Sequence, residues 1–568
     1  MKRLLLLLSL AFTFYGLQAK ILTPEQARKK AEEVLRKPTS TNFRQGKRIR
    51  AVSSASPAYL VFNAADGKGF AVVSTEDNLA DILGYSEEHS FPLSGEMPCA
   101  LSLYLDAFTQ YAEAYANQQA DATDGVPLYA GSPTQLCKTE WGQDAPYNAL
   151  CPVINGRNCL TGCVATAMAQ IMYYWKWPVQ GKGYSAATDK TGGTYGGSLE
   201  HTYQWDAMLP TRVQLNQSEE AAHAVAELMY DCGLAVNMKY DPDGSGAGTP
   251  SKAFYSNFGY IPTTLRHYQR DCFTADEWIA IIRREIDHRR PVFHSASSRT
   301  NGGQDSGGHA FVVDGYDEVG NIRVNWGWNG NFDGFYAVER MNPGGYEFTV
   351  GQEILVGIEP AKNGEEGTPQ EYLYIKNPLK CSKSGTISKS TSFDITVGNV
   401  YNPNALPHQW QLSVGIFDDT NTMLGEVKNG RISTLKLDAN YYISGDFAAI
   451  PCLLKNTYPN GNYALRVVFR ESGSKEWLLP DMAGGITKNA VYIQINGNKI
   501  TFTDGADYIA VGVSNLKSAK KEPDLTRVFD TSGRLIYTAP SSTFNIWDIP
   551  ARGTFIVKKG EKVQKVVR

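Results

Sequence analysis

One cysteine stands at a position in the sequence that favours nucleophilic chemistry. Cys163 opens the segment 163–175, in which apolar residues recur at helical spacing. A thiol in the first turn of a helix lies at the positive end of the helix dipole, which favours the thiolate, the nucleophilic form of cysteine. We expect Thr161 to cap this helix and Pro178 to follow its end. A lone cysteine is more often a small buried residue than a catalytic one. Whether Cys163 is a nucleophile therefore depends on the other residues that accompany it in the sequence.

Two candidate partners lie on either side of this cysteine. Gln143 belongs to a loop 20 residues before Cys163, and a side-chain amide beside the backbone N–H of a nucleophile can form an oxyanion hole. His309 opens an apolar strand directly after two glycines, 146 residues beyond the cysteine. In papain-like cysteine peptidases the nucleophilic cysteine comes first in the chain and the histidine follows at a similar distance. Taken alone, Gln143 could be a solvated residue and His309 a hydrogen-bonded core residue.

Two further patterns could suggest a metal ion. Cys151, Cys159 and Cys163 form a C-x7-C-x3-C series, but it has no C-x-x-C pair and no nearby histidine, so zinc is not expected. The run Asp-Pro-Asp-Gly-Ser-Gly at 241–246 lacks the terminal glutamate of a calcium loop, and a flexible cleft loop is the better interpretation. We expect no metal and no other cofactor.

The length and net charge of the chain limit the number of its domains and the kinds of partner it can have. The chain has 568 residues, enough for three to five domains at roughly 100–200 residues per domain. The net charge, 55 − 58 = −3, and the absence of a long basic run argue against a nucleic-acid partner. Nine cysteines in a chain of this length do not form a disulfide scaffold, and their odd number leaves at least one thiol over.

The N-terminal segment indicates export. Residues 1–19 combine a basic start, a short apolar run and a final alanine, which predicts a signal peptide cleaved after Ala19. No later stretch is apolar and long enough to suggest a membrane span. We expect a secreted or outer-surface protein that travels by way of the periplasm, and a monomer.

Three further regions flank the segment with the candidate site. A helix at 24–36, a hairpin at Asp66-Gly67 and an amphipathic helix at 101–115 predict a small α+β domain over 20–118. Residues 119–134 are small and polar, as in an exposed linker that proteases can cut.

Alternating apolar residues in the C-terminal third predict an Ig-like β-sandwich over 370–495, followed by a small β unit at 505–568. The alternating positions are Trp410, Leu412, Val414 and Ile416 in one strand, and Tyr463, Leu465, Val467 and Phe469 in another.

Four separated segments resemble the streptopain family of secreted bacterial cysteine peptidases. The resemblance implies a papain-like α+β peptidase domain over 135–360, and it extends upstream, where 20–118 is similar to the propeptide of the family. The four segments are Trp141–Asn148, Thr161–Met172, Glu227–Gly248, and Gly307–Gly315 with Val324–Trp328. Within 505–568, the runs Val528–Arg534, Gly553–Val557 and Lys565–Arg568 resemble the C-terminal sorting domain of type IX secretion, which would make the secretion machinery a partner.

The resemblance assigns roles to the candidate residues. Cys163 would be the nucleophile and His309 the general base and later acid, while Gln143 and the Cys163 amide would form the oxyanion hole. The segment Asn325-Trp326 would stand where papain-like enzymes have the asparagine that orients the histidine, and Trp326 would shield the imidazole.

The resemblance also implies a substrate cleft and a mode of control. Gly308, Gly246, Ala247 and Trp328 would line the cleft and bind an extended peptide through backbone groups. The substrate would carry an apolar side chain two residues before the scissile bond. The domain 20–118 would act as an intramolecular inhibitor until the linker is cut.

The sequence therefore predicts a cysteine endopeptidase made as a zymogen, acting on protein or peptide substrates. Two alternatives stay open. The same cysteine and histidine would serve an amidase or transpeptidase that acts on a non-protein amide. The chain could also be a surface adhesin in which the sandwich binds a ligand and the peptidase domain is a relic.

Overall fold

The computed structural model describes most of the chain, and it divides into two units. The described residues are 21–45, 57–76, 81–115, 135–298, 308–317, 319–337, 350–364, 373–430, 433–454, 458–483, 490–505, 525–529, 535–540, 554–559 and 562–567. One unit comprises Met1–Met97, Leu101–Val126 and Tyr336–Phe348, and the other comprises Pro98–Ala100, Pro127–Phe335 and Thr349–Arg568. The predicted signal peptide, 1–19, and linker, 119–134, lie outside the described residues. Among the helices that are described, none combines the length and apolarity needed to cross a membrane.

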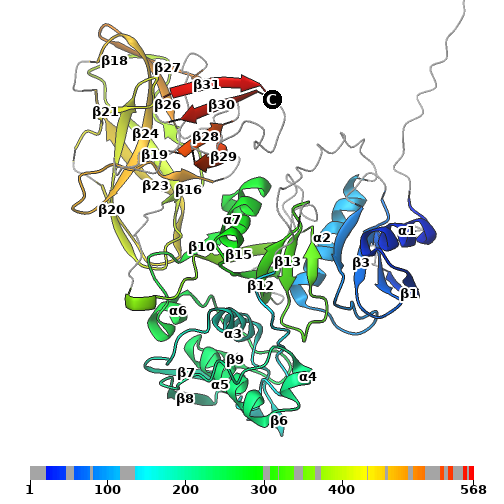
Figure 1. Ribbon diagram of the computed structural model, residues 1–568. Helices are drawn as coiled ribbons and strands as arrows, with labels where there is room; N and C mark the ends of the chain where they lie inside the picture. Colours follow the sequence, from blue (N-terminus) through cyan, green and yellow to red (C-terminus); the bar gives the residue numbers. More distant parts are fainter. Residues whose placement is uncertain are drawn as a thin grey trace, which may run out of the picture. The chain divides into compact units, whose positions relative to one another are not determined.

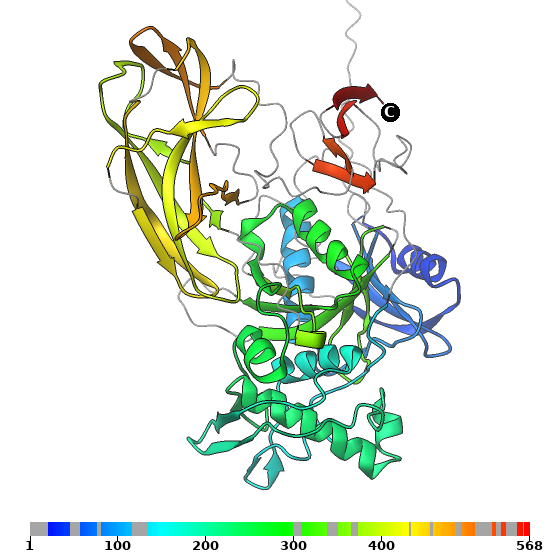
Figure 2. The same cartoon turned by 60° about the vertical axis from the view of Figure 1, so that its left-hand side comes forward.

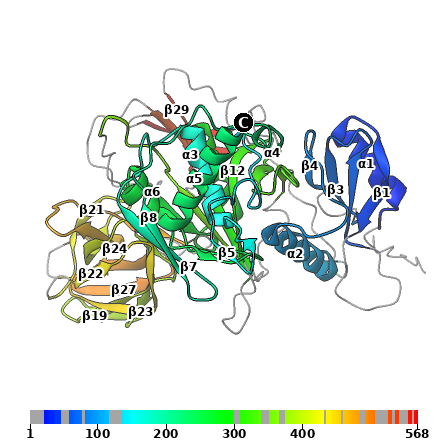
Figure 3. The same cartoon turned by 90° about the horizontal axis from the view of Figure 1, so that it is seen from below.

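The first unit packs helix α1 (Pro24–Leu35) against a small antiparallel sheet, as predicted. The hydroxyl of Thr23 accepts from the Gln26 N–H while the Gln26 side chain accepts from the Thr23 N–H, so a capping box starts the helix. Ala27, Ala31 and Leu35 share a core with apolar residues of the sheet, and Figure 3 shows α1 beside β3. The sheet has the order β1 (Thr39–Gln45), β2 (Tyr59–Ala64), β3 (Phe70–Ser74), β4 (Ile82–Ser86). The predicted second helix is α2 (Cys99–Tyr115).

The second unit is organised around an antiparallel sheet with helices on both faces. Helix α3 (Cys163–Trp175) contacts β12 and β11 from one face, and α7 (Ala275–Asp287) contacts them from the other (Figure 1). The strands follow the order β13 (Ile322–Asn325), β12 (Gly308–Tyr316), β11 (Val292–Ser298), β15 (Val350–Val356), β10 (Arg266–Gln269). The smaller elements of this region are β5 (Val153–Ile154), β6 (Arg157–Asn158), β7 (Tyr184–Asp189), β8 (Thr194–Ser198), α4 (Arg212–Leu215), α5 (Glu219–Ala235), β9 (Lys239–Tyr240), α6 (Ser251–Phe258), η1 (Arg270–Cys272), β14 (Gly334–Tyr336) and η2 (Lys362–Gly364).

Helix α3 is buried along almost its whole length. Every residue from Val164 to Met172 is buried, so small and apolar side chains are needed on all its faces. The prediction that Thr161 caps the helix is wrong. Gly162 is the N-cap, with φ at 86° and no side-chain cap bond, and the Thr161 hydroxyl instead lies 2.8 Å from the Thr166 hydroxyl.

The glycine at this cap is required by both conformation and space. A Cβ at Gly162 would lie 2.6 Å from the Met238 Cε and 3.2 Å from the Ser245 carbonyl oxygen. A left-handed backbone conformation costs a non-glycine residue about 1–2 kcal/mol. We expect Gly162→Ala to destabilise the fold by more than this amount, because the new methyl group also clashes. Chemical denaturation of the purified chain measures the loss. Gly248→Ala is the matched control, since a Cβ at Gly248 meets no atom within 4 Å; equal effects of the two substitutions would contradict this account.

The C-terminal third contains a β-sandwich of two sheets, shown in yellow and orange in Figure 2. Side chains at the alternating positions predicted from the sequence, such as Trp410 and Leu465, are buried between the sheets. The sandwich extends past the predicted end at 495, because β27 (Lys499–Thr503) pairs with β26. One sheet holds β16 (Tyr374–Ile375), β17 (Lys380–Cys381), β19 (Phe393–Asn402), β23 (Tyr441–Cys452) and β25 (Asp481–Met482). The other holds β18 (Thr386–Ser388), β20 (His408–Phe417), β21 (Met423–Glu426), β22 (Ser433–Leu437), β24 (Gly461–Glu471), β26 (Val491–Asn496) and β27.

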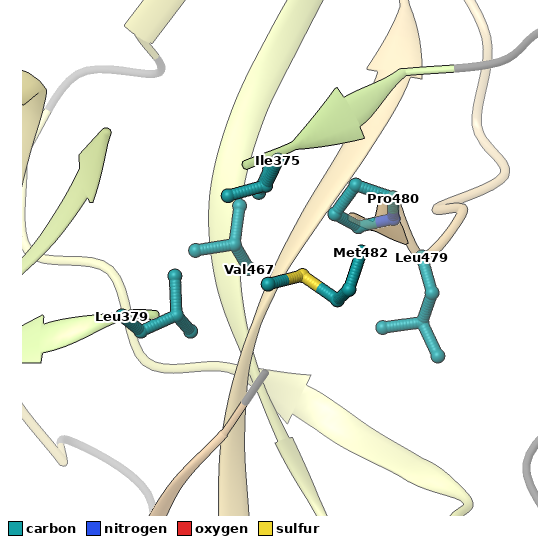
Figure 4. Close-up of a pocket in the computed structure, with 6 residues that line it drawn as sticks. All are labelled: Ile375, Leu379, Val467, Leu479, Pro480 and Met482. Atoms are coloured by element: carbon teal, nitrogen blue, oxygen red, sulfur yellow. The ribbon is translucent and has the colours of Figure 1, made fainter. Parts of the chain in front are cut away.

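The sandwich has a small apolar pocket, and elsewhere it contacts the antiparallel sheet that contains β10. Figure 4 shows the pocket, which is lined by Ile375, Leu379, Val467, Leu479, Pro480 and Met482. The contact is made at β10, where the His267 N–H donates to the Pro403 carbonyl at 2.8 Å and the Tyr401 hydroxyl donates to the His267 carbonyl.

The last described strands form a separate four-stranded sheet, in the order β29 (Leu535–Pro540), β28 (Leu525–Phe529), β30 (Thr554–Lys559), β31 (Lys562–Val567). This agrees with a small β unit near the C-terminus. Its predicted role as a sorting domain stays a prediction.

Candidate active site

Cys163 occupies the first position of α3 and is half-buried. Burial raises the pKa of its thiol, while the backbone N–H groups of Ala310, Val164 and Cys163 itself act in the opposite direction. Burial disfavours the charged form of any acid, and here it outweighs these donors. The thiol is therefore the resting form in this structure.

His309 lies on β12 and is held by a backbone carbonyl. Its Nε2 is 2.8 Å from the Trp326 oxygen, and a carbonyl can only accept, so Nε2 carries the proton. The other ring nitrogen, Nδ1, then has a free lone pair and can act as a base. His309 is 94% buried, and burial lowers its pKa to about 4. The imidazole is therefore neutral at physiological pH.

Aromatic side chains surround this imidazole. The rings of Phe311 and Trp326 lie nearly parallel to it, each with its centroid 6.3 Å away, and Trp328 meets it edge-on at 6.4 Å. The indole N–H of Trp328 is buried and makes no hydrogen bond within the described residues. Trp326 therefore packs face-on beside the imidazole and Trp328 edge-on, while the predicted shielding role of Trp326 stays a prediction.

The thiol and the imidazole are close but not joined. The residue after His309, Ala310, directs its N–H at the Cys163 sulfur. No hydrogen bond links Cys163 to His309 in the described part of the chain, and both groups are neutral. In this structure the two side chains are therefore not paired with each other.

The Gln143 loop is fastened to the start of α3. The Gln143 carbonyl accepts from the Thr161 N–H at 3.1 Å, two residues before Cys163. Trp141 is fully buried, and its indole donates to the Leu209 carbonyl at 2.9 Å. The half-buried Gln143 is therefore held in the same neighbourhood as the Cys163 amide.

The predicted cleft loop packs against the same helix start. Gly246 and Lys239 exchange two backbone hydrogen bonds, of 3.1 and 2.9 Å. Ser245 anchors the loop by donating to the Leu160 carbonyl at 2.7 Å, and Ala247 packs on the core cluster that includes α3. A Cβ at Gly246 would meet no atom within 4 Å, so that side of the loop is open. Gly308 is exposed at the start of β12.

Asn325 makes no hydrogen bond to His309 in the described residues, but it binds the peptide group between Trp326 and Gly327. Its Oδ1 accepts from the Gly327 N–H at 3.0 Å, and this N–H belongs to the same peptide group as the Trp326 carbonyl that holds His309. Asn325 is thus linked to His309 through this peptide group, which is an indirect form of the predicted orienting role.

Sequence reasoning missed the residue that holds Asn325. Gln170, fully buried on α3, forms a reciprocal amide pair with it: Nε2 donates to the Asn325 Oδ1, and the Asn325 Nδ2 donates to the Gln170 Oε1, both at 3.0 Å. The Gln170 Oε1 also accepts from the Thr139 hydroxyl at 2.7 Å. A glutamine among alanines, methionines and isoleucine on a buried helix was the available signal. Asp333, which accepts from the Trp326 N–H at 2.8 Å, was also missed.

Six other cysteines are buried thiols: Cys137, Cys151, Cys159, Cys232, Cys272 and Cys452. Burial is the main cause that raises the pKa of each of them, to about 12 for Cys151, Cys272 and Cys452. They have the character of structural thiols, whereas Cys163 at its helix start is only half-buried.

Comparison with known proteins identifies two regions of the chain. A model of the Peptidase C10 family matches residues 141–336, and a model of the Spi protease inhibitor matches residues 19–112.

Individual relatives cover longer parts of the chain. The thiol protease/hemagglutinin PrtT of Porphyromonas gingivalis is 31% identical over 386 residues, which are 62% of this chain and 43% of PrtT. The chain therefore spans less than half the length of PrtT. Streptopain of Streptococcus pyogenes is 31% identical over 337 residues, 53% of this chain and 80% of streptopain. The solved Prevotella intermedia prointerpain A fragment 39-359 is 31% identical, with a TM-score of 0.47, and the match covers 58% of this chain and all of that one.

A helix-borne thiol beside a strand-borne histidine, in a domain of this fold, defines a cysteine peptidase of papain-like type. The chain belongs to the Peptidase C10 family, which includes streptopain, and carries the inhibitory propeptide domain in front of the peptidase domain. The predicted family and enzyme class are thereby confirmed.

A second buried histidine makes the stability of this region sensitive to acid. His294, fully buried on β11, stacks on Phe311 at 4.5 Å, and burial lowers its pKa to about 3. Below about pH 6.5 the unfolded chain binds a proton that the folded chain excludes, so stability falls with falling pH by about 1.4 kcal/mol per unit for this group, until the folded pKa is reached. We expect His294→Phe to reduce the loss of stability between pH 6 and pH 4, as followed by chemical denaturation. The exposed His223→Phe is the control; identical pH slopes for both variants would refute the assignment.

Proposed function

We propose that Cys163 is the nucleophile and His309 the general base and acid of a cysteine endopeptidase. The observation that carries this assignment is the His309 Nε2 bond to the Trp326 carbonyl, because it leaves the Nδ1 lone pair available beside the helix that carries the thiol. Nδ1 takes the thiol proton as sulfur attacks the peptide carbonyl, and then gives it to the leaving amine. Water, activated by the same nitrogen, hydrolyses the thioester and restores the thiol.

Gln143 and the Cys163 backbone N–H supply the oxyanion hole in this proposal. The bond between the Gln143 carbonyl and the Thr161 N–H supports it, since it fixes the loop to the start of the catalytic helix. Two donors aimed at the developing oxyanion stabilise charge that is absent in the bound substrate, which lowers the barrier to acylation.

The substrate is an extended peptide in this proposal. Gly308 and Gly246 offer exposed backbone, Ala247 continues the loop, and Trp328 supplies an apolar wall. Backbone pairing gives affinity that is independent of substrate sequence, and an apolar side chain two residues before the scissile bond gives selectivity.

The chain is a zymogen controlled by its propeptide domain. We assign 20–118 as the inhibitor domain, 119–134 as the linker cut on maturation, and 135–360 as the peptidase domain. The resting protonation state supports this assignment, since a neutral thiol and a neutral imidazole without a mutual hydrogen bond form no nucleophile. After removal of 1–19, export through the periplasm would deliver a monomeric protein to the surface or medium. The sandwich at 370–495 and the sorting unit at 505–568 would follow the peptidase domain.

Self-processing tests the nucleophile. The chain from residue 20 should lose roughly 100–115 N-terminal residues on incubation and then digest casein, because linker cleavage releases the inhibitor domain. Cys163→Ala should stay intact, while Cys381→Ala, a half-buried cysteine of the sandwich, should behave as the unsubstituted chain. Mass spectrometry of the products over time follows both steps. If the chain stays intact, the linker is cut in vitro; a cut chain that cleaves no protein would sink the proposal.

Kinetics of the matured enzyme test the oxyanion hole. We expect Gln143→Ala to lower kcat by about 10²–10³ with little change in KM, because the lost hydrogen bond forms mainly in the transition state. Asn148→Ala is the control within the same loop: the Asn148 side chain donates to the Cys159 carbonyl, away from the thiol. A Gln143 variant in which only KM rises would show a role in substrate binding instead.

A further inference from the structure

Trp326, whose carbonyl orients His309, lies at the start of a tight loop. The loop 326–333 contains four residues in the left-handed region: Gly327 at φ 69°, Asn329 at 56°, Gly330 at 75° and Phe332 at 68°. A bulky residue such as phenylalanine rarely adopts this conformation, and it persists only where surrounding contacts enforce it. Something must therefore hold the two ends of this loop together.

Asp333 makes that contact. Its Oδ1 accepts from the Trp326 N–H at 2.8 Å and so joins the last residue of the loop to the first. From Trp326 the connection runs directly to the dyad, since the Trp326 carbonyl accepts from His309 Nε2 at 2.8 Å. The ring of Phe332 meets Trp328 edge-on at 6.1 Å, so the closed loop also sets the second indole beside the imidazole.

The carboxyl is buried, and one of its two oxygens is left unsatisfied. Asp333 is fully buried, and its Oδ2 has no hydrogen-bond partner in the described residues. Nearby Arg323 is already engaged by Asp314, with Nη1 2.7 Å from Oδ1. A buried acid with an unsatisfied oxygen costs stability, and such groups concentrate at functional sites.

We propose that Asp333 is a positioning residue of the dyad: it closes the loop 326–333 on Trp326 and thereby holds the carbonyl that orients His309. This inference rests on the proposed roles of Cys163 and His309. A carboxylate accepts a stronger hydrogen bond than a neutral acid does, so its charge state sets how firmly the loop is closed.

The pKa of Asp333 lies near neutral pH. Burial raises its pKa to about 7; Asp314 and Glu140 act in the same direction, and Arg323 and the Trp326 N–H act against it. Below pH 7 the neutral acid holds Trp326 weakly, and above pH 7 the carboxylate holds it firmly. The turnover number should therefore rise through an ionisation near pH 7 that belongs to neither Cys163 nor His309.

The test is the pH dependence of kcat for the matured enzyme, with active sites counted by titration with an alkylating inhibitor. Asp333→Asn keeps an acceptor oxygen but stays neutral. We expect its kcat to be about five- to tenfold below that of the unsubstituted enzyme at pH 8, within twofold of it at pH 5.5, and to lack the ionisation near pH 7. Asp333→Ala, which has no acceptor, should be slower at every pH.

A matched control separates positioning from folding. Asp317 is also buried, and it accepts from the Asn321 N–H at 2.8 Å in the turn between β12 and β13. Asp317→Asn should leave the pH profile of kcat unchanged. Asp333→Asn with an unchanged pH profile, or a loss of thermal stability at pH 8 as its only effect, would overturn the proposal. Activity that survives in Cys163→Ala would instead overturn the underlying assignment of the nucleophile.

Discussion

The reciprocal amide pair between Gln170 and Asn325 is the constraint on which the site depends. It joins the helix that carries Cys163 to the strand that leads into Trp326, and through Thr139 it reaches the segment before Gln143. Each amide satisfies the other in a place that water does not reach. Loss of one partner would leave buried donors and acceptors unpaired, at a cost of about 1–3 kcal/mol for each group. Three segments that are distant in sequence are thus fixed to one another.

Burial then determines what the assembled site can do. It raises the pKa of the Cys163 thiol and lowers that of the His309 imidazole to about 4, so both shifts oppose an ion pair. A thiolate and an imidazolium can coexist only if their mutual attraction replaces the lost hydration. In the roles proposed for the two side chains, they would have to become charged together, which burial opposes in this structure.

Much of this could be predicted from the sequence, because the decisive signals are local. Periodicity gave the buried helix at Cys163 and the alternating strands of the sandwich, and the cysteine–histidine order indicated the enzyme class. The cap at Thr161 was predicted wrongly, since residue type favours threonine while the packing of Met238 against the turn requires Gly162. The indirect role of Asn325 was out of reach. Its link to His309 passes through a backbone carbonyl, and no residue type in a sequence marks which carbonyl a histidine will find.

The buried thiols would have a consequence on the proposed export route, which passes through an oxidising compartment. At neutral pH a thiol whose pKa is about 12, such as Cys151, Cys272 or Cys452, is almost entirely protonated, and thiol–disulfide exchange requires the thiolate. Once folded, the chain can therefore meet disulfide catalysts without forming mispaired bridges at these positions. The order of events matters: folding has to precede oxidation, because the unfolded chain exposes every one of its thiols.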